Sequence, residues 1–181
     1  AAGGLALWDG NAWRALAGDV PPGFYGRLAA GDGRVWIGTA LPRPQECCLL
    51  EWDGRRLTAL PSLSAVRFSV LASDGQTLFS SAWRTVQVWE GGKARSLESF
   101  PAACGGMVSA LAAGQGGDLY AALPLGSAAG CQILSHKSGA WALLPSGPDG
   151  YVVAAMLVTP QGLYVGGRFG RARTLTRSGP M

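Results

Sequence analysis

Few side chains in this chain combine a reactive type with a spacing that suggests chemistry, and the four cysteines come first. Cys47, Cys48, Cys104 and Cys131 all fall in segments between apolar runs that are rich in Gly, Ala or Pro. An even number of cysteines in loops favours disulfides and an oxidising compartment. We expect Cys104 and Cys131 to pair, because they close two enlarged loops of the same stretch of chain. Cys47 and Cys48 then form a vicinal bridge or remain free thiols.

Two other interpretations of the cysteines stay open. A zinc site could combine them with His136, although adjacent cysteines lack the usual two-residue spacer between zinc ligands. The second alternative is a set of buried, reduced cysteines in a cytosolic protein.

Catalytic motifs are missing from the sequence. It contains no G-x-S-x-G elbow, P-loop or H-E-x-x-H pair, and its single histidine is His136. A paired-carboxylate hydrolase would need Asp19, Glu46 or Asp149 to converge across the fold. We therefore expect no catalytic residue, no bound cofactor and no metal ion.

The elements that would position these side chains form a four-fold repeat. Each unit carries a leucine and, after a Gly-containing turn, an aromatic residue, and a third series that is mostly Trp accompanies them. The leucines are Leu28, Leu71, Leu111 and Leu157, the aromatics are Trp36, Phe79, Tyr120 and Tyr164, and the third series is Trp8, Trp52, Trp89 and His136. Such a period marks a supersecondary unit that cannot bury its apolar face alone.

Each unit has the pattern of four short β-strands. The apolar runs are rich in Val, Leu, Ile and aromatic residues, and Asp-Gly or Gly-Gly turns of the kind that suit tight hairpins separate them. No periodic apolar run reaches helix length before a glycine interrupts it. We expect one domain over 1–181, with an outer hairpin in 5–26 and repeats at 27–60, 66–98, 108–145 and 152–181.

Four antiparallel strands in every unit predict an all-β fold, a β-propeller of four-stranded antiparallel blades. The stretch GDGRVWIGT (31–39) resembles the two-component-regulator-type propeller repeat, and LYVGGRF (163–169) together with LALWDG (5–10) resembles kelch-like propeller repeats. The resemblance covers nearly the whole chain. It implies that the first strand of each blade lines a central channel, and it carries no information about a ligand.

The number of blades in the ring stays open. The hairpin at the start of the chain could complete the blade of the fourth repeat and close a four-bladed ring. Alternatively, the four repeats could be part of a larger propeller. We favour the larger propeller, because the sequence starts without Met and stops within a repeat.

Charge and hydropathy argue against two classes of partner. The net charge of +4 comes from Arg168, Arg171, Arg173 and Arg177, and the preceding residues carry equal numbers of acids and bases. Because no basic face runs through the domain, we expect no nucleic-acid partner. The longest apolar run, from Tyr151 to Val158, is too short to span a bilayer, so we expect no membrane insertion by this segment.

The predicted turns sort onto two faces of the fold. Short, uniform Gly-bearing turns share one face, whereas longer and more variable loops share the other, here called the loop-rich face. Variable loops on a rigid scaffold are frequent binding sites. We expect the binding face to include Phe24, Arg43, Glu46, Phe100, Asp149 and Arg171.

Together these features favour a noncatalytic binding or scaffold module. We expect it to contact a protein or a glycan and to be part of a larger assembly. The expected location is extracellular or at the cell surface, with the cytoplasm as the alternative. The alternative function is a propeller-fold enzyme, such as a lyase, glycosidase or oxidase, whose catalytic residues lie partly outside this chain.

Overall fold

The computed structural model describes residues 5–16, 24–40, 47–60, 70–102, 104, 106–125, 130–145 and 149–171. All regular secondary structure among these residues is β-strand, which confirms the all-β fold class. In the same residues, no helix is present that could cross a bilayer.

Sixteen strands follow one another in the described part of the chain. They are β1 (Ala6–Trp8), β2 (Trp13–Ala15), β3 (Phe24–Gly31), β4 (Arg34–Ala40), β5 (Cys47–Trp52), β6 (Leu57–Leu60), β7 (Val70–Ser73), β8 (Leu78–Ala82), β9 (Thr85–Glu90), β10 (Lys93–Ser96), β11 (Ala110–Gly114), β12 (Asp118–Pro124), β13 (Cys131–Lys137), β14 (Ala140–Leu143), β15 (Asp149–Thr159) and β16 (Gly162–Arg171).

The strands form three complete four-stranded antiparallel sheets and two hairpins. Sheets β3–β6, β7–β10 and β11–β14 each pair their strands in sequence order, and β1–β2 and β15–β16 are two-stranded. These sheets are the predicted four-stranded blades, and each begins with the strand that we expected to be innermost. The strand pairing therefore follows the repeat pattern of the sequence.

Short turns with specific chemistry close the hairpins. Between β3 and β4, Asp32 and Gly33 have φ angles of 49° and 70°, so both occupy the left-handed region that a two-residue hairpin turn uses. Between β5 and β6, the Asp53 carboxylate accepts hydrogen bonds from the backbone N–H groups of Arg55 and Arg56, at 2.8 and 2.7 Å. An aspartate of this kind replaces the backbone acceptor of a turn.

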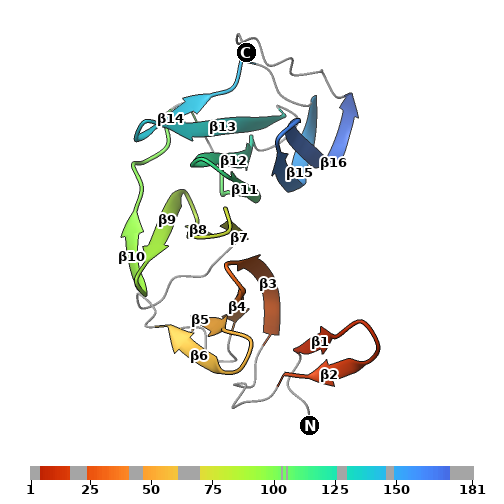
Figure 1. Ribbon diagram of the computed structural model, residues 1–181. Coiled ribbons are helices and arrows are strands. Elements are labelled where there is room, and N and C mark those ends of the chain that lie inside the picture. The colour runs from red at the N-terminus through yellow and green to blue at the C-terminus, as the bar shows by residue number, and fades with distance from the viewer. Residues whose placement is uncertain are drawn as a thin grey trace.

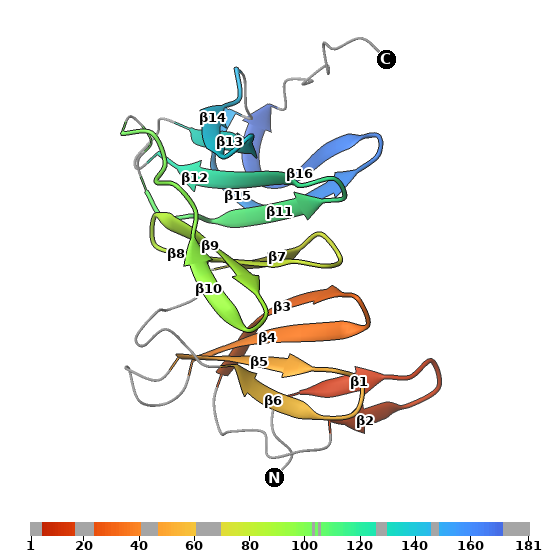
Figure 2. The same cartoon turned by 60° about the vertical axis from the view of Figure 1, so that its left-hand side comes forward.

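The sheets follow one another along an arc. Strands β3, β7, β11 and β15, the first strand of each sheet, lie side by side in that order. Figure 1 shows them along the inner side of the arc, with β6, β10 and β14 along its outer side. Hairpins β1–β2 and β15–β16 lie at opposite ends of the arc in both Figure 1 and Figure 2.

The core consists of apolar layers between successive sheets. Alternate residues of a strand point to opposite faces, so each sheet has an N-side face toward the preceding sheet and a C-side face toward the following one. In β4, Ile37 packs on the N-side with Leu5 and Leu50, whereas Trp36 packs on the C-side among residues such as Leu71. Sheets that bury both faces in this way depend on their neighbours for stability.

The largest apolar layer lies between sheets β7–β10 and β11–β14. It contains Val86, Leu111, Leu134 and Trp141. Of the predicted hairpin tryptophans, Trp89 is buried and Trp52 is half-buried. Trp8, in contrast, is 50% exposed, so this series is not buried at β1.

The structure corrects the leucine series of the repeat in its last member. Leu28, Leu71 and Leu111 each pair with the residue that follows the aromatic of the next strand, whereas Leu157 pairs with the aromatic Tyr164 itself. Met156, which pairs with Val165, is therefore the structural equivalent of the earlier leucines. Residue type alone could not reveal this one-residue slip.

The described residues do not form a closed four-bladed ring. The N-terminal hairpin packs on the sheet that follows it, since Leu5 lies against Ile37 and Leu50. It lies far along the arc from β15–β16, the hairpin that it was to complete (Figure 2). Among the described residues the strands form an open arc of three complete sheets and two half-sheets.

Candidate binding surface

The turn between β8 and β9 presents the most unusual side chain of the loop-rich face. Ala82 pairs with Thr85, so only Trp83 and Arg84 form the turn. Trp83 has a φ of 54° and is 69% exposed. The first central position of such a turn favours glycine, and the left-handed conformation costs a bulky residue roughly 1–2 kcal/mol.

The following segment of the chain holds this turn in place. The backbone N–H of Val108 donates to the carbonyl of Trp83 at 3.0 Å, and the Arg84 guanidinium donates to the carbonyl of Cys104. Ser109 in turn donates its N–H to the carbonyl of Ala122 at 2.8 Å. The turn is thus tied to the connection that leads into sheet β11–β14, which lets the strained tryptophan persist.

A second large apolar residue accompanies Trp83. Met107 is 47% exposed and immediately precedes Val108, the residue that bonds to Trp83. We call Trp83, Arg84 and Met107 the Trp83 surface. An exposed aromatic ring and an exposed thioether on hydrogen-bonded backbone segments are suited to packing against an apolar partner, because both bury much area and methionine adapts its shape.

The sequence analysis missed this surface. Trp83 is the last residue of the strand-like run TLFSSAW (77–83), and nothing in that pattern shows that it lies in a two-residue turn. One signal was available in the sequence. Only Trp83 and Arg84 separate two strand patterns, and a two-residue hairpin turn without Gly or Asn is unusual.

Phe100, in contrast, is not available for binding. It is 6% exposed, and its ring centroid lies 4.7 Å from that of Trp141 in the apolar layer between two sheets. The N–H of Leu97 donates to the carbonyl of Val86 at 2.8 Å, which continues the β9–β10 pairing by one residue toward Phe100. We therefore correct the prediction for Phe100, because the loop that carries it fills the core.

The other predicted binding residues are described only partly. The backbones of Phe24, Asp149 and Arg171 lie at the ends of β3, β15 and β16, where Asp149 pairs with Arg171. Arg43 and Glu46 lie outside the described residues. The binding role of these five residues stays a prediction.

The predicted disulfide is not formed in the structure. Cys104 and Cys131 are free thiols, 2% and 8% exposed, and they belong to two different apolar layers. Burial raises the pKa of each thiol above its ordinary value, so neither is an activated nucleophile. The backbone of Cys47 and Cys48 lies in β5 rather than in a loop, because that strand begins two residues earlier than predicted.

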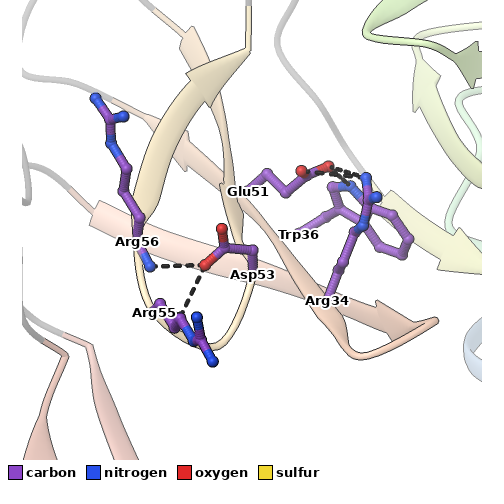
Figure 3. Close-up of polar contacts among 6 residues, drawn as sticks. All are labelled: Arg34, Trp36, Glu51, Asp53, Arg55 and Arg56. Carbon is purple, nitrogen blue, oxygen red and sulfur yellow. Dashed lines mark hydrogen bonds and ion pairs between the residues drawn. The ribbon is translucent and has the colours of Figure 1, made fainter.

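In sheet β3–β6, the polar side chains that could take part in acid–base chemistry are engaged in hydrogen bonds and an ion pair with neighbouring residues (Figure 3). Glu51 accepts a hydrogen bond from Trp36 Nε1 at 2.9 Å and forms an ion pair with Arg34 at 3.3 Å. At the nearby turn, the backbone N–H groups of Arg56 and Arg55 hold the pKa of Asp53 below its ordinary value. This arrangement fixes strands and a turn and leaves Glu51 committed to its neighbours.

The remaining candidate ligands are spread over the fold. His136 packs on Trp141, with ring centroids 4.9 Å apart. Within the described ranges, His, Cys, Asp and Glu side chains do not gather in any group of three that could hold a metal ion. Of the acids that a hydrolase would need, Asp19 and Glu46 lie outside those ranges, and only the backbone of Asp149 lies within them.

Comparison with known proteins identifies the fold. No family model matches the sequence, and no curated protein matches it significantly. Among solved structures, a chain of a nidogen–laminin complex matches with a TM-score of 0.59 and 15% identity, over 80% of this chain and 56% of that one. YCF48 bound to a D1 peptide matches with a TM-score of 0.55 and 16% identity, over 86% and 50% of the two chains.

Glutaminyl cyclase of Myxococcus xanthus also matches, with a TM-score of 0.50 and 16% identity, over 80% of this chain and 61% of the enzyme. All three are β-propeller proteins, so the predicted propeller fold is confirmed. The chain spans between a half and about three fifths of the solved chains that it matches. At this level of identity the likeness shows the fold alone.

Proposed function

We propose that this chain is a noncatalytic binding module that contacts a protein partner through the Trp83 surface. One observation carries the proposal: Trp83 is 69% exposed and sits in a backbone conformation that a glycine would adopt without strain. A residue that costs stability and yet stays in solvent has a role outside the fold.

The chemistry of the surface favours a protein over a charged polymer. Trp and Met bury large apolar areas, and tryptophan is enriched among the residues that dominate interface energies. The only cationic group of the surface, on Arg84, already donates to the carbonyl of Cys104. Two of the structural neighbours, nidogen and YCF48, are seen with protein or peptide partners, which agrees with such a role.

We further propose that the module belongs to a larger assembly outside the cell or at its surface. The support is the open arc, in which β1–β2 and β15–β16 are two-stranded among the described residues. The location does not draw support from a disulfide between Cys104 and Cys131, because both thiols are free in the structure. Fractionation of the native host protein between secreted, surface and cytoplasmic pools is the direct measurement.

We propose no catalytic step. Glu51 is engaged by Trp36 and Arg34, and His136 packs on an aromatic ring. Among the described residues, the contacts of Glu51 and His136 are therefore those of structural side chains.

The test compares the wild type with Trp83→Gly. Glycine retains the turn and removes the aromatic ring, so we expect the variant to fold while losing partner binding. A displayed library of peptides is panned against the immobilised wild-type chain and then counter-selected on Trp83→Gly. We expect peptides with apolar anchors that bind the wild type at least ten-fold more tightly than the variant.

Leu143→Ser provides the matched control, because Leu143 is 51% exposed but lies on β14, at the outer side of the arc. It should bind the selected peptides as the wild type does. The proposal fails if every selected peptide binds Trp83→Gly equally well. It also fails if a glycan array, and not the peptide library, discriminates the two proteins.

A further inference from the structure

The N-terminal hairpin exposes side chains that the complete sheets bury. Trp8 pairs with Trp13, as Trp89 pairs with Ala94 and His136 with Trp141 in the complete sheets. Trp89 and Trp141 are 6% and 7% exposed, whereas Trp8 and Trp13 are 50% and 71% exposed. The hairpin thus has the composition of the outer half of a sheet, and its N-side face is uncovered.

The C-terminal hairpin is the opposite half of a sheet. Tyr164 in β16 is equivalent to Trp36 in β4, since each is the repeat aromatic of the second strand. Trp36 is 5% exposed and covered by the following sheet, whereas Tyr164 is 57% exposed. In every complete sheet the second strand pairs on both sides, but among the described residues β16 pairs only with β15.

The register of the complete sheets specifies how the two halves would fit. Val35 pairs with Trp52, Leu78 with Trp89 and Leu119 with His136. The equivalent residues of the two hairpins are Leu163 in β16 and Trp8 in β1. Pairing them places Tyr164 opposite Leu7, which is 49% exposed, and an aromatic–aliphatic pair of this kind stabilises neighbouring strands.

A third exposed residue lies at the same junction. Leu28 in β3 is 63% exposed, although its equivalents Leu71 and Leu111 are 7% and 5% exposed. Leu71 is covered by Trp36 of the preceding sheet. A β15–β16 hairpin that precedes β3–β6 would bring Tyr164 to Leu28 in the same way.

We propose that β1–β2 of one copy of this chain completes the β15–β16 sheet of a second copy. The two hairpins of a single copy lie at opposite ends of the arc (Figures 1 and 2), and Leu5 fixes β1–β2 to its own following sheet. A second copy can supply the outer strands of the β15–β16 sheet while Leu5 of each copy keeps its contact with the sheet that follows it. The occupant of the open β16 edge is therefore the same sequence pattern on another chain.

The exchange is reciprocal and closes on itself. Each copy holds three complete sheets and gains one composite sheet, so a pair of copies would hold eight four-stranded sheets. Propellers typically contain four to eight blades, and a two-fold pair satisfies both open ends at once. The dimer interface is distinct from the Trp83 surface and does not depend on the proposed function.

The test uses two variants of the full 181-residue chain, Leu7→Cys and Tyr164→Cys, each of which adds one cysteine to the four of the wild type. Both positions are exposed, so folding should be retained, which a thermal melt checks. Residues directly opposite in paired strands have the spacing that a disulfide needs. After the two variants are mixed and oxidised, we expect peptide mapping to find a 7–164 link between chains.

Three results would overturn the proposal. One is the absence of a 7–164 link in the mixture while both variants melt like the wild type. Another is a link that forms in the Leu7→Cys/Tyr164→Cys double variant at the mass of a single chain and not in the mixture, because the ring would then close on itself. The last is a 7–164 link that is no more abundant than the 7–93 link formed when a Lys93→Cys variant replaces Tyr164→Cys in the mixture.

Solution mass provides a second readout. The wild-type chain should have twice its monomer mass of 18.6 kDa in light scattering at micromolar concentration. Tyr164→Lys should shift the dissociation constant at least ten-fold toward monomer, whereas Leu143→Lys, an exposed position outside the junction, should leave it unchanged. A wild-type monomer at this concentration, or equal effects of both variants, would contradict the exchange.

Discussion

At the residue scale, Trp83 and Phe100 depart from what the local sequence pattern predicts, and each departure has an identifiable cause. Trp83 keeps a left-handed backbone because two hydrogen bonds tie its turn to the next segment. Phe100 leaves the predicted binding face because the apolar layer beside Trp141 accepts its ring. In both residues the neighbouring segment, rather than the local pattern, decides whether an aromatic side chain is exposed or buried.

Replacing Trp83 by glycine should stabilise the chain while it impairs binding. Relief of the left-handed strain is worth roughly 1–2 kcal/mol, and the greater freedom of glycine in the unfolded chain offsets part of it. We expect a net increase of about 0.5–1 kcal/mol in the free energy of unfolding, measured by urea denaturation. Trp83→Ala, which keeps the strain, is the control, and a less stable Trp83→Gly would contradict the prediction.

The buried thiols should make stability depend on alkaline pH. The pKa of Cys131 is raised in the folded state, so its contribution to stability is complete below the ordinary thiol pKa of 9.0 and is lost as pH rises through the folded value. We expect the free energy of unfolding to fall more between pH 7 and 10 for the wild type than for Cys131→Ala. Identical pH profiles would show that the thiol does not titrate differently on folding.

At the element scale, the sheets are held together by close approaches between their first strands. Gly31 ends β3 against the next sheet, where an added Cβ would lie 2.6 Å from Gly75 Cα. Gly114 ends β11 in the same manner, and its Cβ would lie 2.4 Å from Val158 Cγ1. These small residues set how closely successive sheets pack along the inner side of the arc.

Gly31→Ala should therefore destabilise the chain. The nearest atoms are backbone atoms of Gly75, which cannot move aside as a side-chain tip would, so we expect a loss of about 1–3 kcal/mol, typical of overpacking. Thermal and urea unfolding measure the loss. Gly166→Ala is the matched control in β16, because its nearest contact would be an ordinary 3.9 Å. Equal stabilities of the two variants would refute the close-packing argument.

At the scale of the whole molecule, the described strands form a linear stack in which each sheet packs on the next one along the chain. Stability in such stacks is a sum of the units and their interfaces, so the ends are the weakest part. Hairpin β1–β2 has only three residues in each strand and exposed tryptophans, whereas β12 and β13 lie within the largest apolar layer.

Hydrogen exchange should reflect this gradient. In a dilute, monomeric sample we expect the amides of β1 and β2 to exchange at least a hundred-fold faster than those of β12 and β13, measured by mass spectrometry of peptide fragments. Raising the concentration should protect β1 and β2 selectively as the composite sheet forms. Uniform protection along the chain in the monomer would argue against a stack of separable units.

The sequence by itself determined the strands, the hairpin turns and the repeat. Strand alternation and Asp-Gly turns are local properties, and so the pairing of β3 to β14 followed from residue types at their positions. The binding surface was predicted only as a face, because exposure depends on what each loop packs against. The sequence pattern therefore could not predict that Trp83 is exposed or that Phe100 is buried.

Only the tertiary structure decided how the repeats associate. Whether β1–β2 joins β15–β16 of the same chain depends on contacts between residues more than a hundred positions apart, and the open arc keeps these two hairpins at opposite ends (Figures 1 and 2). The one-residue slip at Met156 depends on where the β15–β16 turn falls, because regular pairing back from Thr159 and Gly162 places Met156 opposite Val165. Local chemistry specifies the blade, whereas the packing between blades specifies the arc.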